Sequence, residues 1–193
     1  MKLWLSTFCL LVLFVSTSRA HADIFKFNDL KGFEACMLND HLKETTTVGG
    51  DKQERHLSQP DIQVRCVQSA VKMLKAGNPT SANILEFVKT TKRNSAHEQS
   101  LELIELLAAK DPKGCNDMEA YSVLKSALSH PQDYPTAQNS YFEKTKRIVK
   151  LCNKDAEFRK DFLEEKDSSE AYVATNACAI LLAEKAVKSC PKK

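Results

Sequence analysis

The chain has 193 residues, of which 28 are Lys or Arg and 25 are Asp or Glu, so its formal net charge is +3. Basic and acidic residues are interspersed, which argues against the concentrated positive stretches that bind nucleic acid. The C-terminal KSCPKK segment is too short to change this conclusion.

Residues 1–22 have the pattern of a cleaved secretory signal peptide. Lys2 supplies an early positive charge, an apolar run covers 8–15, and Ala20-His21-Ala22 matches the A-x-A cleavage pattern. The apolar run is shorter than the roughly 20 residues that a membrane-spanning helix needs. We therefore expect export, either extracellular or to a bacterial periplasm. The mature chain 23–193 is expected to form a single domain without a membrane span.

The first part of the mature chain is predicted to contain a helix and a long loop. NDLKGFEACMLNDHL places Leu30, Phe33 and Met37 on one helical face, which predicts a helix near 29–42. The polar segment 43–59 comes next and contains a Gly-Gly pair. Its TTTV sequence is the only strand candidate, and four residues are too few for a convincing strand. We therefore expect a loop over 43–59.

Three helices are predicted next from their start and stop signals. Pro60 and Gly77 bound the second helix, and Thr80 or Ser81 caps the third. A capping box, Ser95 with Glu98, opens the fourth helix, in which each side chain satisfies a backbone N–H of the first turn.

Four more helices complete the predicted fold. The fifth carries 121–128, the sixth runs from Thr136 to Cys152 after a proline-rich break, and a short seventh contains Phe158. The eighth is expected to continue from about Asp167 to Cys190, and its many alanines favour a central position. The sequence thus predicts an all-α protein, a compact antiparallel bundle of about seven to eight helices.

Cysteine usage agrees with export. Of the seven cysteines, Cys9 lies in the signal peptide, which leaves six in the mature chain. An even number in an exported protein predicts three disulfides. No two of them form the closely spaced pair that a zinc site needs, so we predict no metal site. The six are Cys36, Cys66, Cys115, Cys152, Cys178 and Cys190.

A pairing follows from the predicted helices. In an unbroken helix, Cys178 and Cys190 would be about 18 Å apart along the axis, whereas a disulfide needs Cα atoms within about 7 Å. Each is therefore expected to reach another helix. If successive helices alternate in direction, the heights of the cysteines favour the pairs Cys36–Cys66, Cys152–Cys178 and Cys115–Cys190.

The sequence has no strong catalytic or nucleotide-binding motif. HEQSL, which begins at His97, lacks the second histidine of the HExxH zinc motif, and no glycine pattern suits a phosphate-binding loop. One enzymatic hypothesis remains open. Cys115 at a helix N-terminus would have a stabilised thiolate, with His97 or His130 as its base. A structural half-cystine fits the even count better, so we expect no enzymatic activity and no cofactor.

Aromatic residues in the later helices support a second hypothesis, a carrier of a small apolar ligand. Aromatics at helical spacing usually fill the core, and they can also line a cavity between helices. The residues concerned are Tyr134, Tyr141, Phe142, Phe158 and Phe162.

Loop 43–59 supports the preferred hypothesis, a protein-binding module. Long loops in compact domains are usually functional or disordered, and both alternatives stay open here. The polar residues of the loop that suit contact with a protein are Lys43, Glu44, Asp51, Lys52, Glu54, Arg55 and His56. We therefore predict a secreted, non-enzymatic binding module that engages a protein partner through helix surface and this loop.

Overall fold

The computed structural model describes residues 25–48, 51–94, 97–129, 138–163, 171–183 and 185–190. The predicted signal peptide lies outside them. These residues form eight α-helices, one 3-10 helix and one two-stranded sheet, which confirms the all-α prediction. In chain order the elements are α1 (Leu30–Met37), β1 (Lys43–Val48), β2 (Asp51–His56), α2 (Gln59–Gly77), α3 (Ser81–Arg93), α4 (His97–Lys110), the 3-10 helix η1 (Pro112–Asn116), α5 (Met118–Ser129), α6 (Gln138–Cys152), α7 (Ala156–Leu163) and α8 (Ala171–Ala183).

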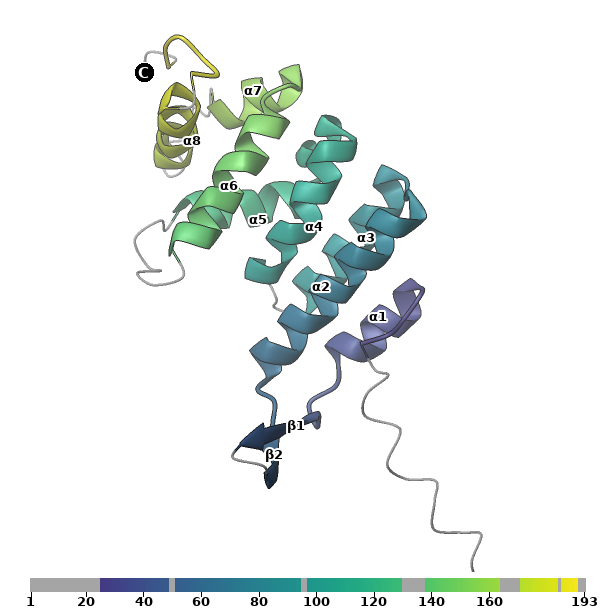
Figure 1. The fold of residues 1–193 in the computed structure, drawn as a ribbon. Helices are drawn as coiled ribbons and strands as arrows, with labels where there is room; N and C mark the ends of the chain where they lie inside the picture. The colour runs from purple at the N-terminus through teal and green to yellow at the C-terminus, as the bar shows by residue number, and fades with distance from the viewer. Residues whose placement is uncertain are drawn as a thin grey trace, which may run out of the picture.

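The helices pack side by side in a series that leads from α1 to α8 (Figure 1). α1 packs against α2 and α3 at one end, and α8 packs against α5, α6 and α7 at the other. α4 lies between the two ends, where it contacts α2, α3, α5, α6 and η1. The expectation that the alanine-rich last helix is central is therefore wrong.

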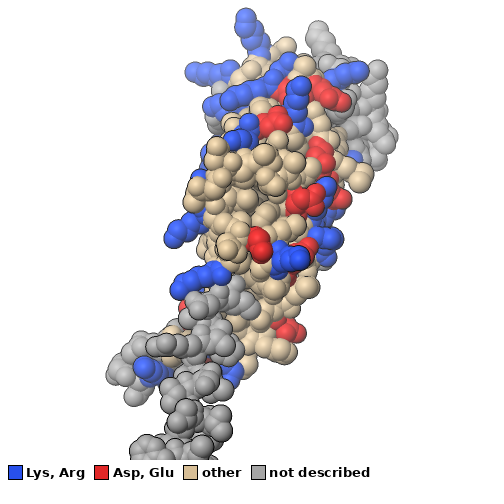
Figure 2. Space-filling model, turned by 90° about the vertical axis from the view of Figure 1, so that its right-hand side faces the viewer, with Lys and Arg blue, Asp and Glu red and all other residues tan. Residues whose placement is uncertain are grey.

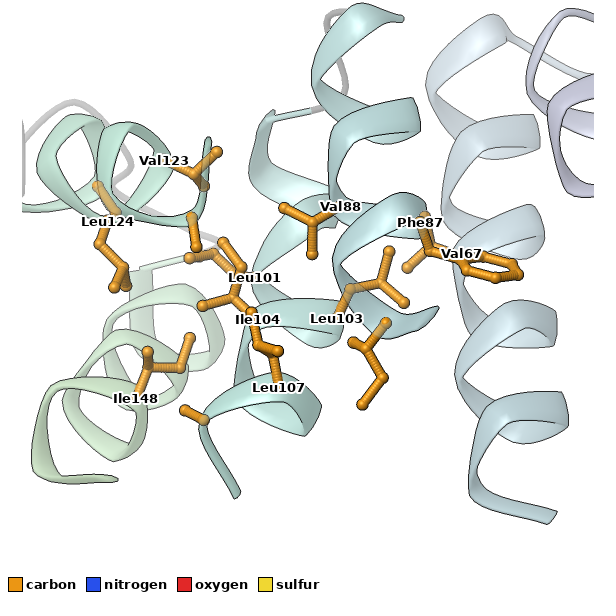
Figure 3. Close-up of a cluster of buried hydrophobic side chains, with 14 of the residues drawn as sticks. Val67, Phe87, Val88, Leu101, Leu103, Ile104, Leu107, Val123, Leu124 and Ile148 are labelled. Carbon is orange, nitrogen blue, oxygen red and sulfur yellow. The ribbon is translucent and has the colours of Figure 1, made fainter. Parts of the chain in front are cut away.

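α4 is central because its apolar residues serve more than one neighbour. Leu101, Leu103 and Ile104 are fully buried although they do not share one narrow stripe. In Figure 3, Leu103 lies on the side of α4 that faces Val67 of α2, whereas Ile104 lies on the side that faces Ile148 of α6. A helix that is apolar around much of its circumference belongs in the interior, whereas one with a single apolar stripe covers the outside.

The predicted signals for the start of α3 and the end of α2 are found in the structure, except that Asn78 rather than Gly77 takes the left-handed conformation that ends α2. The hydroxyl of Ser58 accepts a hydrogen bond from the first turn of α2, and Thr80 forms a capping box with Asn83 at the start of α3. Gly77 is the last residue of α2, and Asn78 after it takes the left-handed conformation with φ 47°. Asn visits this region more readily than most residues, so it ends the helix.

The segment predicted to be loop 43–59 forms a β-hairpin instead. β1 and β2 pair antiparallel, with Lys43 opposite His56 and Val48 opposite Asp51. This register leaves Gly49-Gly50 between the strands, and two-residue hairpin connections favour glycine. The prediction failed because the second strand, DKQERH, has few strand-forming residues. Packing of leucines at the base of the hairpin overrides that weak propensity.

Three disulfides are present, as predicted, but only one of the predicted pairs is correct. Cys36 of α1 bonds Cys66 of α2, with Cα atoms 5.9 Å apart. The predicted bonds Cys152–Cys178 and Cys115–Cys190 are wrong. The structure contains Cys115–Cys152 and Cys178–Cys190, with Cα separations of 5.8 Å and 5.7 Å.

The error arose where α8 ends. The helix stops at Ala183, and Lys185 takes the left-handed conformation with φ 55°. The N–H groups of Lys185 and Ala186 donate to carbonyl oxygens in the last turn of the helix, at 3.0 and 2.8 Å, which is the Schellman arrangement. The chain therefore turns back, and Cys190 meets Cys178 rather than lying about 18 Å beyond it.

The other incorrect pair has the same origin. Cys115 lies in η1, just beyond α4, and Cys152 is the last residue of α6, so both lie at one end of the fold. The side-chain amide of Asn116 donates to Asp155 Oδ1 (2.8 Å) next to this bond. Both cysteines were correctly expected at this end. A continuous last helix wrongly placed Cys190 there as a competing partner.

Candidate functional site

The base of the hairpin is anchored in the hydrophobic core. Leu42 and Leu57 flank the two strands and have exposed fractions of 2% and 6%. The N–H of Leu57 donates to the carbonyl of Leu42 (2.8 Å), which continues the pairing of the strands. Neither leucine was predicted as part of this site. A signal was present, because both lie equally far from Gly49-Gly50, and a hairpin centred there brings them together.

One face of the hairpin is held against α2 by ion pairs. Glu44 and Arg55 lie opposite each other and share this face. Arg65 Nη2 of α2 is 2.8 Å from Glu44 Oε1, and Arg55 Nη2 is 3.6 Å from Asp61 Oδ2. Pairs with this much exposure each contribute about 1 kcal/mol or less. Their main consequence is to fix the direction in which the hairpin projects.

The carboxylate of Asp61 is prepared for this contact. The hydroxyl of Ser58 donates to Asp61 Oδ2 (2.7 Å), and this bond, helped by the Arg55 guanidinium, lowers the pKa of Asp61. A lowered pKa keeps the carboxylate ionised to a more acidic pH than that of an ordinary aspartate. Asp61 therefore stays charged, and can attract Arg55, at neutral pH and somewhat below it.

The opposite face, which we call the outward face, is polar and exposed. It consists of Lys43, Thr45, Lys52, Glu54 and His56. Lys43 Nζ lies 3.3 Å from Glu54 Oε2, so the two strands are also linked on this side. The hairpin projects from the bundle beyond the near ends of α1 and α2 (Figure 1). Four of the seven predicted site residues therefore lie on one exposed surface.

The other three predicted residues do not join that surface. Glu44 and Arg55 contact α2 and so position the hairpin. Asp51 is the first residue of β2, and its side chain lies outside the described part of the structure.

A shallow hollow of about 350 Å³ lies between α3 and α5, and charged side chains line it. Its lining consists of Glu86, Lys89, Lys92, Arg93 and Glu119. Lys89 Nζ is 2.9 Å from Glu86 Oε1, and this hydrogen bond raises the pKa of Lys89. Lys92 pairs with Glu119, and Arg93 pairs with Glu34 of α1. These charges satisfy one another and tie three helices together, so the hollow carries no ligand hypothesis.

Cys115 has no free thiol in this structure. It is fully buried and bonded to Cys152, so it cannot act as the nucleophile of the enzymatic hypothesis in this oxidised state. The side chain of His97 and the whole of His130, its suggested bases, lie outside the described residues. In the part of the chain that the structure describes, no group of three or more His, Cys, Asp or Glu residues could hold a metal ion.

The carrier hypothesis depends on residues that are mostly outside the described part. Phe158 is fully buried in the core. Tyr141 and Phe142 lie in α6 and Phe162 lies in α7, but their side chains are not described, and Tyr134 lies outside the described residues. A ligand cavity among these aromatics therefore stays a prediction.

No protein-family model matches the chain, and the searches of curated proteins and of solved structures also found no match. Among the described residues, no helix is both long enough and apolar enough to span a bilayer. The three disulfides are compatible with an oxidising compartment. The hairpin is the site where a predicted functional segment and a distinctive geometry coincide.

Proposed function

We propose that the protein is an exported, non-enzymatic binding module whose hairpin contacts a protein partner through its outward face. The observation that carries this proposal is that the hairpin is polar, projects from the bundle and has a base that is fixed in place. Leu42 and Leu57 hold it in the core, and Glu44 and Arg55 hold it on α2. A projection fixed in this way loses little conformational entropy when it binds.

The size of the hairpin indicates that neighbouring helix surface takes part. A six-residue strand is about 20 Å long, so one hairpin face is smaller than the roughly 800 Å² that each partner buries in a stable complex. Two exposed apolar side chains lie on the adjoining elements: Leu38 just after α1, 69% exposed, and Val64 of α2, 38% exposed. Such residues suit the apolar centre of an interface, with the charged outward face as its rim.

Photo-crosslinking tests the proposal before the partner is known. We would replace Lys52 of the outward face with a photo-reactive phenylalanine analogue and irradiate the oxidised protein in fluid from its natural compartment. The same replacement at Lys154, exposed between α6 and α7, is the control. We expect a protein adduct of defined mass from position 52 and none from position 154. No adduct, or the same adducts from both positions, would contradict the proposal.

Once captured, the partner allows a matched comparison of affinities. Lys52→Ala with Glu54→Ala removes one cation and one anion from the outward face, and Lys154→Ala with Glu157→Ala makes the same change on exposed residues at α7. We expect the first pair to weaken binding roughly tenfold or more and the second to leave it within about twofold. Native mass spectrometry of the purified protein adds an independent readout. A small apolar molecule that leaves on denaturation would favour the carrier hypothesis instead.

A further inference from the structure

Three chain reversals meet at the end of the molecule where α2, α4 and α6 finish (Figure 1). Lys110 Nζ, at the end of α4, donates to Asn78 Oδ1 in the turn after α2 (2.8 Å). The Cys115–Cys152 bond joins η1 to the end of α6. The ends of three helices that are far apart in sequence are thus held next to one another.

Basic residues collect on this end, which we call the basic end. It consists of Lys75, Lys110, Lys113, Lys154, Arg159 and Lys160, all of them exposed. Figure 2 shows Lys and Arg side chains gathered over the upper end of the molecule, with a few Asp and Glu side chains among them.

The cations of the basic end lack the carboxylate partners that several cations on the sides of the bundle have. On the sides, Lys144 pairs with Glu102, and Arg147 makes two hydrogen bonds to Glu105, which raise the pKa of Arg147. At the basic end, none of the six cations forms an ion pair with a carboxylate among the described residues. Lys110 donates instead to the amide oxygen of Asn78.

Two of the nearby carboxylates, Asp111 and Asp155, are engaged in other contacts, whereas Glu157 in the first turn of α7 is exposed. Asp111 accepts the N–H of Lys113 at the start of η1 (3.1 Å). Asp155 accepts the N–H of Phe158 and the amide of Asn116, and both bonds lower the pKa of Asp155. These carboxylates cap backbone N–H groups, so they do not pair with the cations beside them.

Helix dipoles account for only part of this arrangement. Lys75 and Lys110 lie in the last turns of α2 and α4, where a cation is stabilised. Lys160 also lies in the last turn of its helix, α7, whereas Lys154 lies just before the start of α7 at Ala156. A cation near a helix N-terminus is destabilising. The helix dipole therefore does not account for Lys154, and Arg159 donates to the carbonyl oxygen of Asn153 (2.6 Å) rather than to a carboxylate.

We propose that the basic end binds a sulfated polysaccharide. A linear polyanion can span three adjacent reversals and neutralise cations that lack carboxylate partners. A membrane is less suitable, because binding in the bilayer interface adds clustered apolar side chains. The exposed large apolar residues among those described do not cluster there: Met118 follows η1 at the start of α5, whereas Leu38, Val64 and Leu182 lie on other elements.

A nucleic acid is also less suitable. Among the described side chains, those of Phe, Tyr and Trp are buried or only partly exposed, which leaves little ring surface for bases to stack on. The three disulfides are compatible with an oxidising compartment such as the extracellular space, where sulfated polysaccharides occur. The basic end and the hairpin lie at opposite ends of the molecule in Figure 1, so the two sites can be occupied together and tested separately.

Heparin oligosaccharides test the proposal by calorimetry at several salt concentrations. Lys113→Gln with Lys154→Gln removes two cations of the basic end, and Lys31→Gln with Lys52→Gln removes two exposed cations elsewhere. We expect the first variant to bind roughly tenfold more weakly, with a slope of log Kd against log salt reduced by about two. The second should keep both the affinity and the slope. Circular dichroism of both variants controls for folding.

Several outcomes would overturn the proposal. No heparin binding by the wild-type protein at low salt would refute it directly. Equal losses in the two variants would show a response to net charge alone. Binding to phosphatidylserine vesicles without binding to heparin would assign the basic end to membranes. Single-stranded DNA bound as tightly as heparin would remove the preference for a polysaccharide.

Discussion

Removing the Cys115–Cys152 disulfide should reduce the free energy of unfolding more than removing Cys178–Cys190. The two bonds join residues separated by 37 and 12 positions. From the chain-entropy relation, their contributions at 25 °C are about 3.8 and about 2.8 kcal/mol. Cys115 and Cys152 are also fully buried, whereas Cys190 is partly exposed, so alanine at the first pair also removes more core packing. We expect a difference of at least about 1 kcal/mol.

Urea unfolding of the oxidised double variants Cys115→Ala/Cys152→Ala and Cys178→Ala/Cys190→Ala measures this difference. A thiol titration in denaturant accompanies each curve. Each variant should contain no free thiol, because each removes both partners of one bond. If the pairs were Cys152–Cys178 and Cys115–Cys190, each variant would contain two unpaired cysteines. Free thiols in both variants, or equal destabilisation, would refute the pairing and the reasoning built on it.

Three further changes test local features of the fold. Lys185→Gly should raise the free energy of unfolding by about 1 kcal/mol, because φ 55° is unfavourable for any residue with a Cβ atom. The control, Lys188→Gly, loses the same charge and should lower the free energy of unfolding slightly. Urea unfolding measures both. Thr91→Val should lower it by about 1 kcal/mol in the same assay, because it removes the buried hydrogen bond to Ser100 (2.5 Å). Hydrogen bonds lower the pKa of Asp155 below its ordinary 3.8, so its contribution to stability is present above that pH and is lost as the pH falls through the lowered pKa. The Tm difference between the wild-type protein and Asp155→Asn should therefore shrink between about pH 6 and about pH 2, and an unchanged difference would contradict this explanation.

The helices could be predicted because their signals are local. Thr80 and Asn83 lie within one turn of each other, so the capping box of α3 needs no information from the rest of the chain. The Cys36–Cys66 bond was predictable for a related reason. Its cysteines lie on consecutive helices, at matching distances from the segment that connects them.

The features that were missed depend on contacts between distant residues or on unusual conformations. Lys185 carries no sequence mark of a helix end, since it is neither glycine nor asparagine, and its left-handed conformation is stabilised by contacts of the C-terminal residues beyond it. Val187 packs against the core just past the turn, and Cys190 bonds back to α8. The hairpin likewise depends on Leu42 and Leu57 reaching the core, which the composition of the strands does not indicate.

The residues of the hairpin also divide into those that lie where the sequence predicted and those that do not. Lys52 and His56 were expected to face a partner, and both are exposed on the outward face. Glu44 and Arg55 were expected to do so as well, but alternation along the strands turns them toward α2. A loop prediction treats all polar residues of a segment alike, whereas a hairpin sorts them into two faces with different roles.

The basic end shows why an even mixture of charges in the sequence does not describe the surface. Its six cations are distributed over 75–160 and alternate with acidic residues, which led to the prediction that the chain has no concentrated positive region. Folding places the ends of α2, α4 and α6 together and uses carboxylates such as Asp111 and Asp155 as backbone caps. The cations beside them then remain without carboxylate partners at one end, while Lys144 and Arg147 are paired with carboxylates along the sides. Net charge is a property of the composition, but the location of unpaired charge is set by which carboxylates the fold has already engaged.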